Sequence, residues 1–344
     1  MHIDVDFEKV EKILHVADVH IRNYKRHKEY RQVFRKLYRA AKKLPKNSLI
    51  YVAGDIVHTK TDISPELVQI VSEFLNKLAN IRPTIVIAGN HDANLNNKSR
   101  LDSLSPIIEN LANPNLHYLR DSGIYSVADV DFIVYSILED PTTWPNAKDS
   151  KSKNRIGLFH GAVNNSKTDA GYTVRDENLP LKTFDGCHIV MLGDIHKFQL
   201  LNKSKTVAYS GSLIQQNFGE AFENHGYVLW DIETRSGEFF NILNDYGYYT
   251  LRVKDGILPN IDDIPKYPRL RFITENTTQA QIKEMLIEIR KKCKVHDFVA
   301  IRADKLSNLS NNSRGSTEIT KDIRDSEYQN KLIIEHLERN FPVI

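Results

Sequence analysis

Acidic, amide and histidine side chains recur in this sequence directly after short apolar runs. The residues are Asp18 and His20, Asp55 and His58, Asn90, His91 and Asp92, His160, and Asp194 and His196. Carboxylate oxygens, an amide oxygen and imidazole nitrogens suit Mn, Fe or Zn better than they suit a soft-metal site. Two divalent ions ~3.5–4 Å apart need a carboxylate that touches both ions. This set supplies enough ligands for such a pair.

A lone histidine at a strand end is more often a satisfied polar residue than a metal ligand. Five strand ends that all carry ligand-type residues are hard to explain by core packing, because burying so many ionisable groups without cations is very costly. The sequence therefore predicts a metal site rather than a purely structural role. Gly54, Gly89 and Gly193 stand beside the ligands, and we expect them to allow sharp turns there.

The apolar runs are short, rich in β-branched residues and without alternation, which predicts strands buried on both faces. His15 lies inside one of them, so we expect it in the core. Helical patterns lie between the runs: Ser64-Pro65 begins one helix, and Ser105-Pro106 begins another in the same way. Strands that alternate with helices predict an α/β sheet, whose ligands collect at the carboxyl ends of the strands.

The pattern changes from about Tyr209. Residues 226–232 and 248–253 predict further strands, and residues 270–302 predict a β-α-β unit. Residues 307–316 are polar and turn-rich, as in a flexible linker. A last helical pattern covers residues 317–341.

Composition excludes several classes of protein. The chain has 344 residues, of which 41% are hydrophobic and 26% charged, as in an ordinary globular protein. No apolar run approaches the ~20 residues that span a membrane. Two cysteines are too few for a disulfide scaffold or a cysteine zinc cage. The N-terminus lacks the apolar stretch of a secretory signal. These features predict a cytoplasmic or nucleoid-associated protein that is not secreted.

The positive charge is concentrated in one segment. From His20 to Lys46 there are eleven Lys or Arg residues and one acid, Glu29, which gives +10 in a chain whose net charge is +3. Such a segment is a candidate surface for a polyanion. It is equally well interpreted as the solvated face of a helix, because apolar residues from Val33 to Ala41 fall at helical spacing.

The ordered motifs resemble those of the calcineurin-like metallophosphoesterase superfamily. These motifs are Asp18-Val-His20, Gly54-Asp55-Ile-Val-His58, Gly89-Asn-His-Asp92, His160 and Gly193-Asp-Ile-His196. Within the superfamily the chain is most similar to the SbcD-type DNA repair exonuclease subunits, which are counterparts of the eukaryotic meiotic-recombination nuclease. His58 and Asp92 favour this branch, because protein phosphatases carry Asp-Arg-Gly and Glu at the corresponding places.

The resemblance implies an α/β fold, namely a metallophosphoesterase-type α/β/β/α sandwich with a small C-terminal α+β capping domain. The implied divisions are a nuclease domain over residues 1–247, a DNA-capping domain over 248–304, a flexible linker over 305–316, and a helical segment for an ATPase partner over 317–344.

The resemblance also implies the role of each motif residue. One metal ion would be held by Asp18, His20, Asp55 and His196. The other would be held by Asp55, Asn90, His160 and Asp194. His91 would stabilise the transition state or protonate the leaving oxygen, Asp92 would orient its ring, and His58 would lie near the scissile phosphate. The family uses Mn²⁺, and Mg²⁺ is the alternative.

Asp194 departs from the family, which usually has His at this position. With three carboxylates the two-metal cluster carries a net charge of +1, where a His would leave +2. We expect Asp194 to hold the second metal as a weaker Lewis acid and to shift its preference toward harder ions. The alternative is that Asp194 turns away and leaves a weak second site.

The function implied is a 3′–5′ exonuclease on duplex ends and a single-strand endonuclease. The expected phosphate contacts are Arg22, Lys25, Arg26, Lys28, Arg31 and Arg35. The implied partners are DNA, an SbcC-type coiled-coil ATPase and a second copy of the chain, and no membrane. A calcineurin-like phosphatase or small-molecule phosphodiesterase is the main alternative. A non-catalytic scaffold ranks low, because every ligand position carries a ligand-type side chain.

Overall fold

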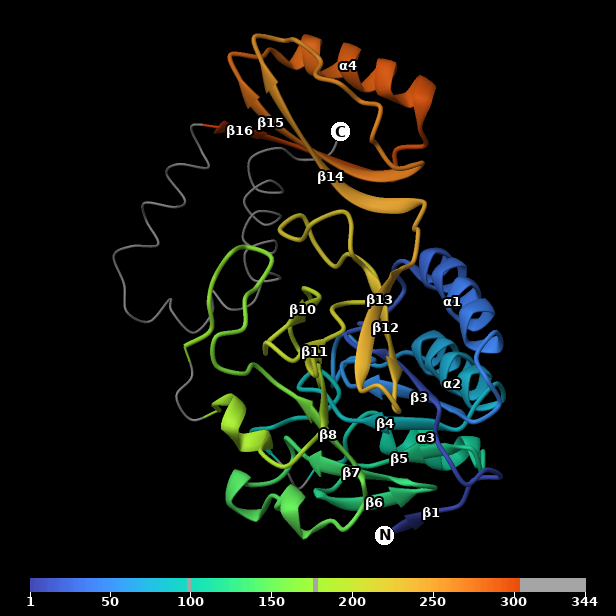
Figure 1. Cartoon of the computed structure of the whole chain (residues 1–344). Helices are drawn as coiled ribbons and strands as arrows, with labels where there is room; N and C mark the ends of the chain where they lie inside the picture. Colours follow the sequence, from blue (N-terminus) through green and yellow to red (C-terminus); the bar gives the residue numbers. More distant parts are fainter. Residues whose placement is uncertain (98–99, 176–178, 304–344) are drawn as a thin grey trace. The chain divides into compact units, whose positions relative to one another are not determined.

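The computed structural model describes residues 1–97, 100–175 and 179–303 (Figure 1). The expected linker 305–316 and tail 317–344 lie outside the described residues. The chain forms two compact units. The first consists of Met1–Ile214 and Glu223–Asn244, and the second of Gln215–Phe222 and the described residues from Asp245 onward. The structure thus assigns the loop Gln215–Phe222 to the second unit, whereas the sequence places it within the first.

The described part of the first unit contains two sheets. One has the strand order β13-β12-β2-β3-β4-β5. Its strands are β2 (Lys12–Val16), β3 (Ser48–Ala53), β4 (Thr84–Ile87), β5 (Leu116–Tyr118), β12 (Gly226–Asp231) and β13 (Ser236–Asn241). The other has the order β1-β6-β7-β8-β9-β11-β10. Its strands are β1 (His2–Ile3), β6 (Gly123–Val127), β7 (Val130–Tyr135), β8 (Asn154–His160), β9 (Ile189–Gly193), β10 (Gln199–Leu200) and β11 (Val207–Tyr209).

The strands that carry the motifs run parallel. β2 pairs with β3 and β3 with β4 in the first sheet, and β8 pairs with β9 in the second. Every residue of β3, β4 and β9 is buried, which confirms the prediction of strands covered on both faces. Parallel pairing brings the carboxyl ends of these strands to one edge of each sheet, and the motif residues follow those ends.

Three layers of apolar packing hold the first unit together. Helices α1 (His27–Lys42), α2 (Pro65–Ala79) and α3 (Ser105–Leu111) cover the outer face of the β2 sheet (Figure 1). Residues such as Ile13, Tyr51 and Phe132 fill the space between the two sheets. The outer face of the β8 sheet packs against loops and 3₁₀ turns that include Ala147 and Phe184. The predicted α/β sandwich is confirmed, although in the described residues loops and 3₁₀ turns stand where the α/β/β/α arrangement placed the second helical layer. His15 is fully buried, as expected.

The two helix starts differ. The hydroxyl of Ser64 accepts a hydrogen bond from Leu67 N at 3.2 Å, and Pro65 follows it, which confirms the predicted cap. At the second start the helix begins at Ser105 itself. The carboxylate of Asp102 accepts bonds from the backbone N–H groups of Leu104 (2.9 Å) and Ser105 (2.7 Å). Asp102 therefore does the capping expected of Ser105, because it lies far enough upstream to reach those free N–H groups.

The described part of the second unit is a three-stranded parallel sheet with one helix. Its elements are β14 (Tyr246–Lys254), β15 (Tyr267–Glu275), α4 (Gln279–Lys292) and β16 (Asp297–Arg302). Thr278 and Gln281 form a reciprocal capping box at the start of α4. Leu270, Phe272 and Ile289 are buried where the helix packs on the sheet, which confirms the predicted β-α-β unit. None of the helices in the described residues combines the length and the apolar character that a membrane span requires.

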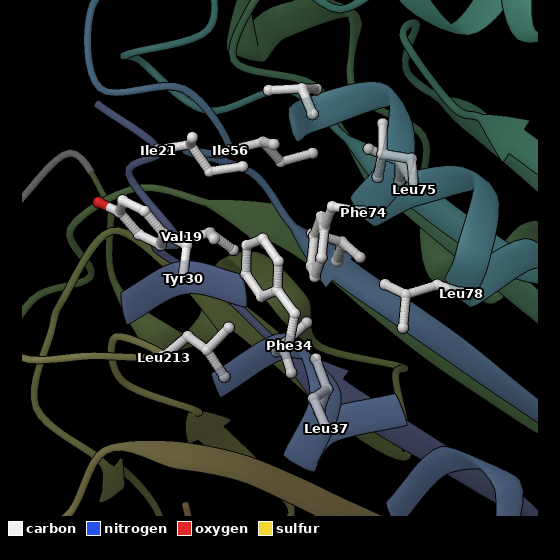
Figure 2. Close-up of a cluster of buried hydrophobic side chains, with 14 of the residues drawn as sticks. Val19, Ile21, Tyr30, Phe34, Leu37, Ile56, Phe74, Leu75, Leu78 and Leu213 are labelled. Atoms are coloured by element: carbon white, nitrogen blue, oxygen red, sulfur yellow. The ribbon is translucent and has the colours of Figure 1, made fainter. Parts of the chain in front are cut away.

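The contact between α1 and α2 depends on two aromatic rings, Phe34 and Phe74, whose centroids are 4.3 Å apart (Figure 2). Phe74 is fully buried. We predict that Phe74→Ala lowers the free energy of unfolding by ~3–5 kcal/mol, because the lost ring leaves a cavity. Val68→Ala on the same helix is the control; Val68 is 37% exposed, so it should change stability by about 0.5 kcal/mol or less. Urea denaturation measures both, and equal effects would contradict the prediction.

Candidate metal centre

The two sheets place the motif residues around one carboxylate, that of Asp55. The Oδ2 atom of Asp55 lies 3.5 Å from His20 Nε2, and its Oδ1 atom lies 3.4 Å from His160 Nε2. Asp55 follows β3, His20 follows β2, and His160 ends β8 in the other sheet. The two oxygens of one carboxylate thus face two different histidines, the arrangement that a shared ligand between two cations requires.

The ligand-type residues gather in three overlapping groups. The ligand atoms of Asp18, His20 and His196 lie within 4.8 Å of one another, and so do those of Asp18, Asp55 and His160 and those of His20, His58 and His91. His20 Nε2 and His196 Nε2 are 3.0 Å apart. Because these groups share Asp18 and His20, the structure brings the residues expected at the two ion positions into one continuous cluster, and His58 and His91 adjoin it.

The hydrogen bonds of His160 test whether a cation fits this cluster. His160 Nδ1 lies 2.6 Å from the backbone carbonyl oxygen of Ala53, and a carbonyl only accepts, so Nδ1 carries a proton. His160 Nε2 then faces Asp55 Oδ1 at 3.4 Å and Asn90 Oδ1 at 3.0 Å. Three acceptor atoms at such distances repel one another unless a proton or a metal ion lies between them. The donor set therefore fits a divalent cation, with His160 oriented as metal-bound histidines are.

The charges of the cluster point the same way. Asp18, Asp55 and His160 are each at most 2% exposed. Burial raises the pKa of Asp18 to about 7, and the charges of Asp55 and Asp194 contribute to the increase. Burial would also raise the pKa of Asp55, but His160 and His20 bring it below its usual range. Several buried carboxylates that repel one another need positive charge, which bound cations supply.

Asp194 lies at the edge of the cluster. Its backbone N–H donates to Asp18 Oδ1 at 3.0 Å, and its own Oδ1 atom lies 3.9 Å from His160 Nε2. A quarter of its side chain is exposed. Its φ of 99° is unusual for a residue other than glycine. Asp194 thus faces the side of the cluster that holds His160 and Asn90, while remaining accessible to solvent.

His91 and His58 lie beside the cluster. The ring centroids of His20 and His91 are 4.8 Å apart, and those of His58 and His91 are 5.7 Å apart. His91 Nδ1 donates to the backbone carbonyl of His58 at 2.7 Å, so its Nε2 atom is the one left for chemistry. The backbone N–H of His91 donates to Asp55 Oδ1 at 2.8 Å. These contacts fix the ring of His91 next to the ligands.

The expected role of Asp92 is wrong in its detail. The carboxylate of Asp92 is fully buried and accepts three backbone hydrogen bonds, from Ile56 and Val57 at 3.0 Å and from Gly89 at 2.9 Å. It holds the loop after Asp55 against the loop after β4. The carbonyl of His58 orients the ring of His91 instead. The hydrogen bonds of Asp92 thus go to backbone donors, while Nδ1 of His91 is already bonded to the carbonyl of His58.

The three motif glycines act for two different reasons. Gly54 has a φ of +79°, which favours glycine, so the expected sharp turn is present there. Gly89 and Gly193 are needed because other groups approach them closely. A Cβ at position 89 would lie 2.1 Å from Asp55 Oδ1, and one at position 193 would lie 2.1 Å from the carbonyl oxygen of Ala53. Close packing around the ligands excludes side chains at both positions.

The basic segment is only partly available to a polyanion. Lys25, Lys28 and Arg35 are exposed. Arg26 is not: its guanidinium forms two 2.9 Å hydrogen bonds with the carboxylate of Glu29, and both side chains are at most 4% exposed. Arg26 is therefore removed from the expected phosphate contacts, because its charge is neutralised inside the protein.

The other two expected phosphate contacts, Arg31 and Arg22, are less available than the three exposed residues. Arg31 pairs with Glu73 of α2, and Arg22 is half-buried.

The sequence analysis does not assign a role at the site to two tyrosines that support it, Tyr30 and Tyr209. The hydroxyl of Tyr30 donates to the backbone carbonyl of His20. The hydroxyl of Tyr209 donates to the carbonyl of Gly161 at 2.7 Å and accepts from Val163 N at 2.8 Å, so it holds the loop after His160. Tyr209 stands at the start of the turn where the sequence pattern changes, which is a usable signal. Tyr30 shows only the apolar spacing of α1.

We predict that Gly89→Ala weakens Mn²⁺ binding about 10–100-fold, because the added methyl group displaces the carboxylate of Asp55. Mutations that disturb the orientation of a metal ligand lower metal affinity by factors of this size. Isothermal titration calorimetry of the metal-free protein measures the affinity. Gly123→Ala is the control: the nearest atom to its Cβ is a side-chain carbon of Tyr125 at 3.3 Å, far from the cluster. Unchanged Mn²⁺ affinity in Gly89→Ala would contradict the close approach seen here.

Two of the relatives found by comparison with known proteins are similar to this chain as follows. Uncharacterized protein R555 of Acanthamoeba polyphaga mimivirus is 43% identical over 326 residues, which cover 91% of this chain and 24% of that protein. The chain thus matches about a quarter of the length of that relative. The SbcD component of the SbcCD nuclease of Staphylococcus epidermidis is 28% identical over 259 residues, 64% of this chain and 66% of that protein.

A family profile extends across most of the first unit. The profile of the calcineurin-like phosphoesterases matches residues 11–198, a range that includes every motif residue from Asp18 to His196. The buried cluster of carboxylates and histidines around Asp55 agrees with the metal dependence of phosphoesterase chemistry. The chain belongs to the calcineurin-like phosphoesterase family.

Proposed function

We propose that this phosphoesterase is a metal-dependent DNA nuclease that acts as a 3′–5′ exonuclease on duplex ends and as an endonuclease on single strands. The observation that carries the proposal is the position of Asp55 between His20 and His160, with the ring of His91 fixed beside them. The name of the staphylococcal relative, a nuclease component, supports the choice of substrate.

The cluster divides into ligands for two ions. Asp18, His20, Asp55 and His196 would hold the first, and Asp55, Asn90, His160 and Asp194 the second. Oxygen and imidazole donors suit Mn²⁺, with Mg²⁺ as the alternative. When bound, such ions polarise a phosphoryl oxygen and lower the pKa of a water ligand.

His91 has the geometry of a proton donor. With Nδ1 bonded to the carbonyl of His58, the Nε2 atom of His91 can carry a proton to the oxygen that leaves the phosphorus. His58 is 9% exposed and its ring centroid lies 5.7 Å from that of His91, so His58 would contribute to the same side of the phosphate. Asp92 would act by holding these loops together rather than by contacting the ring.

The exposed cations favour a long polyanion over a small ester. Lys25 and Lys28 are exposed and lie within ten residues of His20. Arg35 is also exposed, on α1, seven residues after Lys28. Lysine and arginine side chains of this kind contact phosphates and set the register of a nucleic acid. A small-molecule phosphodiesterase or phosphatase would share the metal site and would have no use for this exposed charge.

We extend the proposal to partners on the strength of the same relative. The SbcCD name of the staphylococcal protein suggests an SbcC-type coiled-coil ATPase as partner for this chain, with residues 317–344 as the docking segment and a second copy of the chain as a dimer partner. The second unit, residues 248–304 in the sequence division, would position DNA as a cap.

The test is a nuclease assay with a 5′-labelled duplex and a labelled single strand, in Mn²⁺, in Mg²⁺ and in EDTA. We expect Mn²⁺-dependent shortening from the 3′ end. His91→Ala should lower the rate about 10²–10⁴-fold, because it removes a proton donor without removing a metal ligand. Asp55→Asn should abolish both activity and tight Mn²⁺ binding. His2→Ala is the matched control, since His2 is exposed and lies outside the cluster.

Other outcomes distinguish the alternatives. Wild-type protein that hydrolyses bis(4-nitrophenyl) phosphate and leaves DNA intact would contradict the nuclease proposal and favour a small-molecule phosphodiesterase. Wild-type protein that binds DNA with neither activity would favour a scaffold.

Asp194 yields a separate prediction. If its carboxylate contributes negative charge to the second ion, Asp194→His should raise the rate severalfold in saturating Mn²⁺ and shift the preference from Mg²⁺ toward Mn²⁺, because a neutral ligand leaves a stronger and softer Lewis-acid site. Metal titrations of activity with both ions measure this. The same rate and the same preference in both proteins would show that Asp194 does not act as a ligand.

A further inference from the structure

A basic loop with an outward aromatic ring follows the first metal motif. The loop spans residues 21–26, between the ligand His20 and the start of α1. Tyr24 is 71% exposed, which makes it the most exposed aromatic side chain among the described residues. Single exposed apolar residues are common on protein surfaces, so this ring is informative only through its surroundings.

Both ends of this loop are firmly held. At its start, the backbone N–H of Ile21 donates to the carbonyl of Ile56 at 2.8 Å, which joins it to the loop that carries Asp55. The side chain of Asn23 donates to the carbonyl of Asp62 at 2.6 Å and accepts from Ser64 N at 3.1 Å. At its end, Arg26 is locked to Glu29. The residues on either side of Tyr24 are therefore fixed.

The backbone turns Tyr24 outward at a conformational cost. Tyr24 has a φ of 54° and Arg26 a φ of 62°, values that are uncommon for bulky side chains. Residues in such conformations persist only where the surroundings impose them, and they concentrate at functional sites. An exposed tyrosine gains no burial that would offset this cost.

The surroundings of the ring match one class of ligand. Lys25 adjoins Tyr24 in the chain, Lys28 follows four residues after Tyr24, and both lysines are exposed. An aromatic ring among cations stacks on a nucleobase while the cations contact phosphates. Tyr24 is four positions after His20 in the chain, so the two Cα atoms lie at most ~14 Å apart. That is about four stacked nucleotides at ~3.4 Å each.

We propose that Tyr24 stacks on a nucleobase within about four nucleotides of the scissile phosphate and so selects nucleic acid over simple phosphodiesters. This rests on the proposed nuclease function and adds a substrate contact that the metal cluster cannot provide. Tyr24 is a specificity-determining residue in this account, because its ring touches the substrate away from the reacting atoms. Lys25 and Lys28 hold the backbone of the same strand.

The test compares intact oligonucleotides with oligonucleotides that lack one base at each of the four positions nearest the cleaved bond. Its measure is the ratio of kcat/KM for each oligonucleotide to kcat/KM for bis(4-nitrophenyl) phosphate. Stacking on one base is worth enough for about a 10-fold change. In the wild type, removal of the base that Tyr24 contacts should lower the ratio by about that factor.

The variants give the decisive comparison. Tyr24→Ala and Tyr24→Leu should lower the ratio for the intact strand about 10-fold and should no longer distinguish intact from abasic strands. Tyr24→Phe should behave as wild type, because it keeps the ring. Tyr172→Ala is the matched control, since Tyr172 is 59% exposed in another loop. Thermal unfolding confirms that each variant folds.

Each negative result has its own meaning. If wild type cleaves oligonucleotides and Tyr24→Ala does so with the same ratio, the stacking proposal fails and the nuclease proposal stands. The stacking proposal also fails, and the nuclease proposal stands, if Tyr24→Ala lowers the kcat/KM ratio equally for intact and abasic strands. That result would make Tyr24 a structural residue. If wild type cleaves only the aryl ester, both proposals fail.

Discussion

The structure depends on one buried carboxylate. Asp55 contacts His20 through one oxygen and His160 through the other, and it also accepts the backbone N–H of His91. These partners come from two loops and from the end of one strand, and they belong to both sheets. A charge buried to 2% exposure is tolerable only where opposite charge or donors surround it. The requirement to satisfy Asp55 therefore fixes how closely the loops approach, and the glycines at 54 and 89 make that approach sterically feasible.

Backbone carbonyl groups determine the chemistry of the histidines around this carboxylate. The carbonyl of Ala53 takes the proton of His160 Nδ1, and the carbonyl of His58 takes that of His91 Nδ1. In each ring the Nε2 atom is then left to face the cluster. In the proposed mechanism His160 would hold a metal ion and His91 would serve the leaving group, although a backbone carbonyl orients both rings. The different roles proposed follow from position, since His160 ends a strand and His91 lies in a loop.

The sequence predicts which residues gather and where the strands lie, because apolar runs and their polar ends are local features. It does not predict partners that are remote in the chain. Asp92 appears next to His91 in the sequence, yet its carboxylate binds the backbone of residues 56 and 57. Gly89 looks like a turn residue, yet its role is to admit the carboxylate of Asp55. Arg26 looks like a surface cation, yet a single acid, Glu29, removes it from the surface.

The three backbone bonds of Asp92 have a consequence for mutational studies of this family. An isosteric amide at this position would turn an NH₂ group toward a backbone N–H that now meets an oxygen, and two donors would oppose each other. The loops bearing Asp55 and His91 would separate even though neither residue had been altered. An inactive amide variant at position 92 would therefore report a broken scaffold, and it would be a poor argument for proton transfer by this carboxyl group.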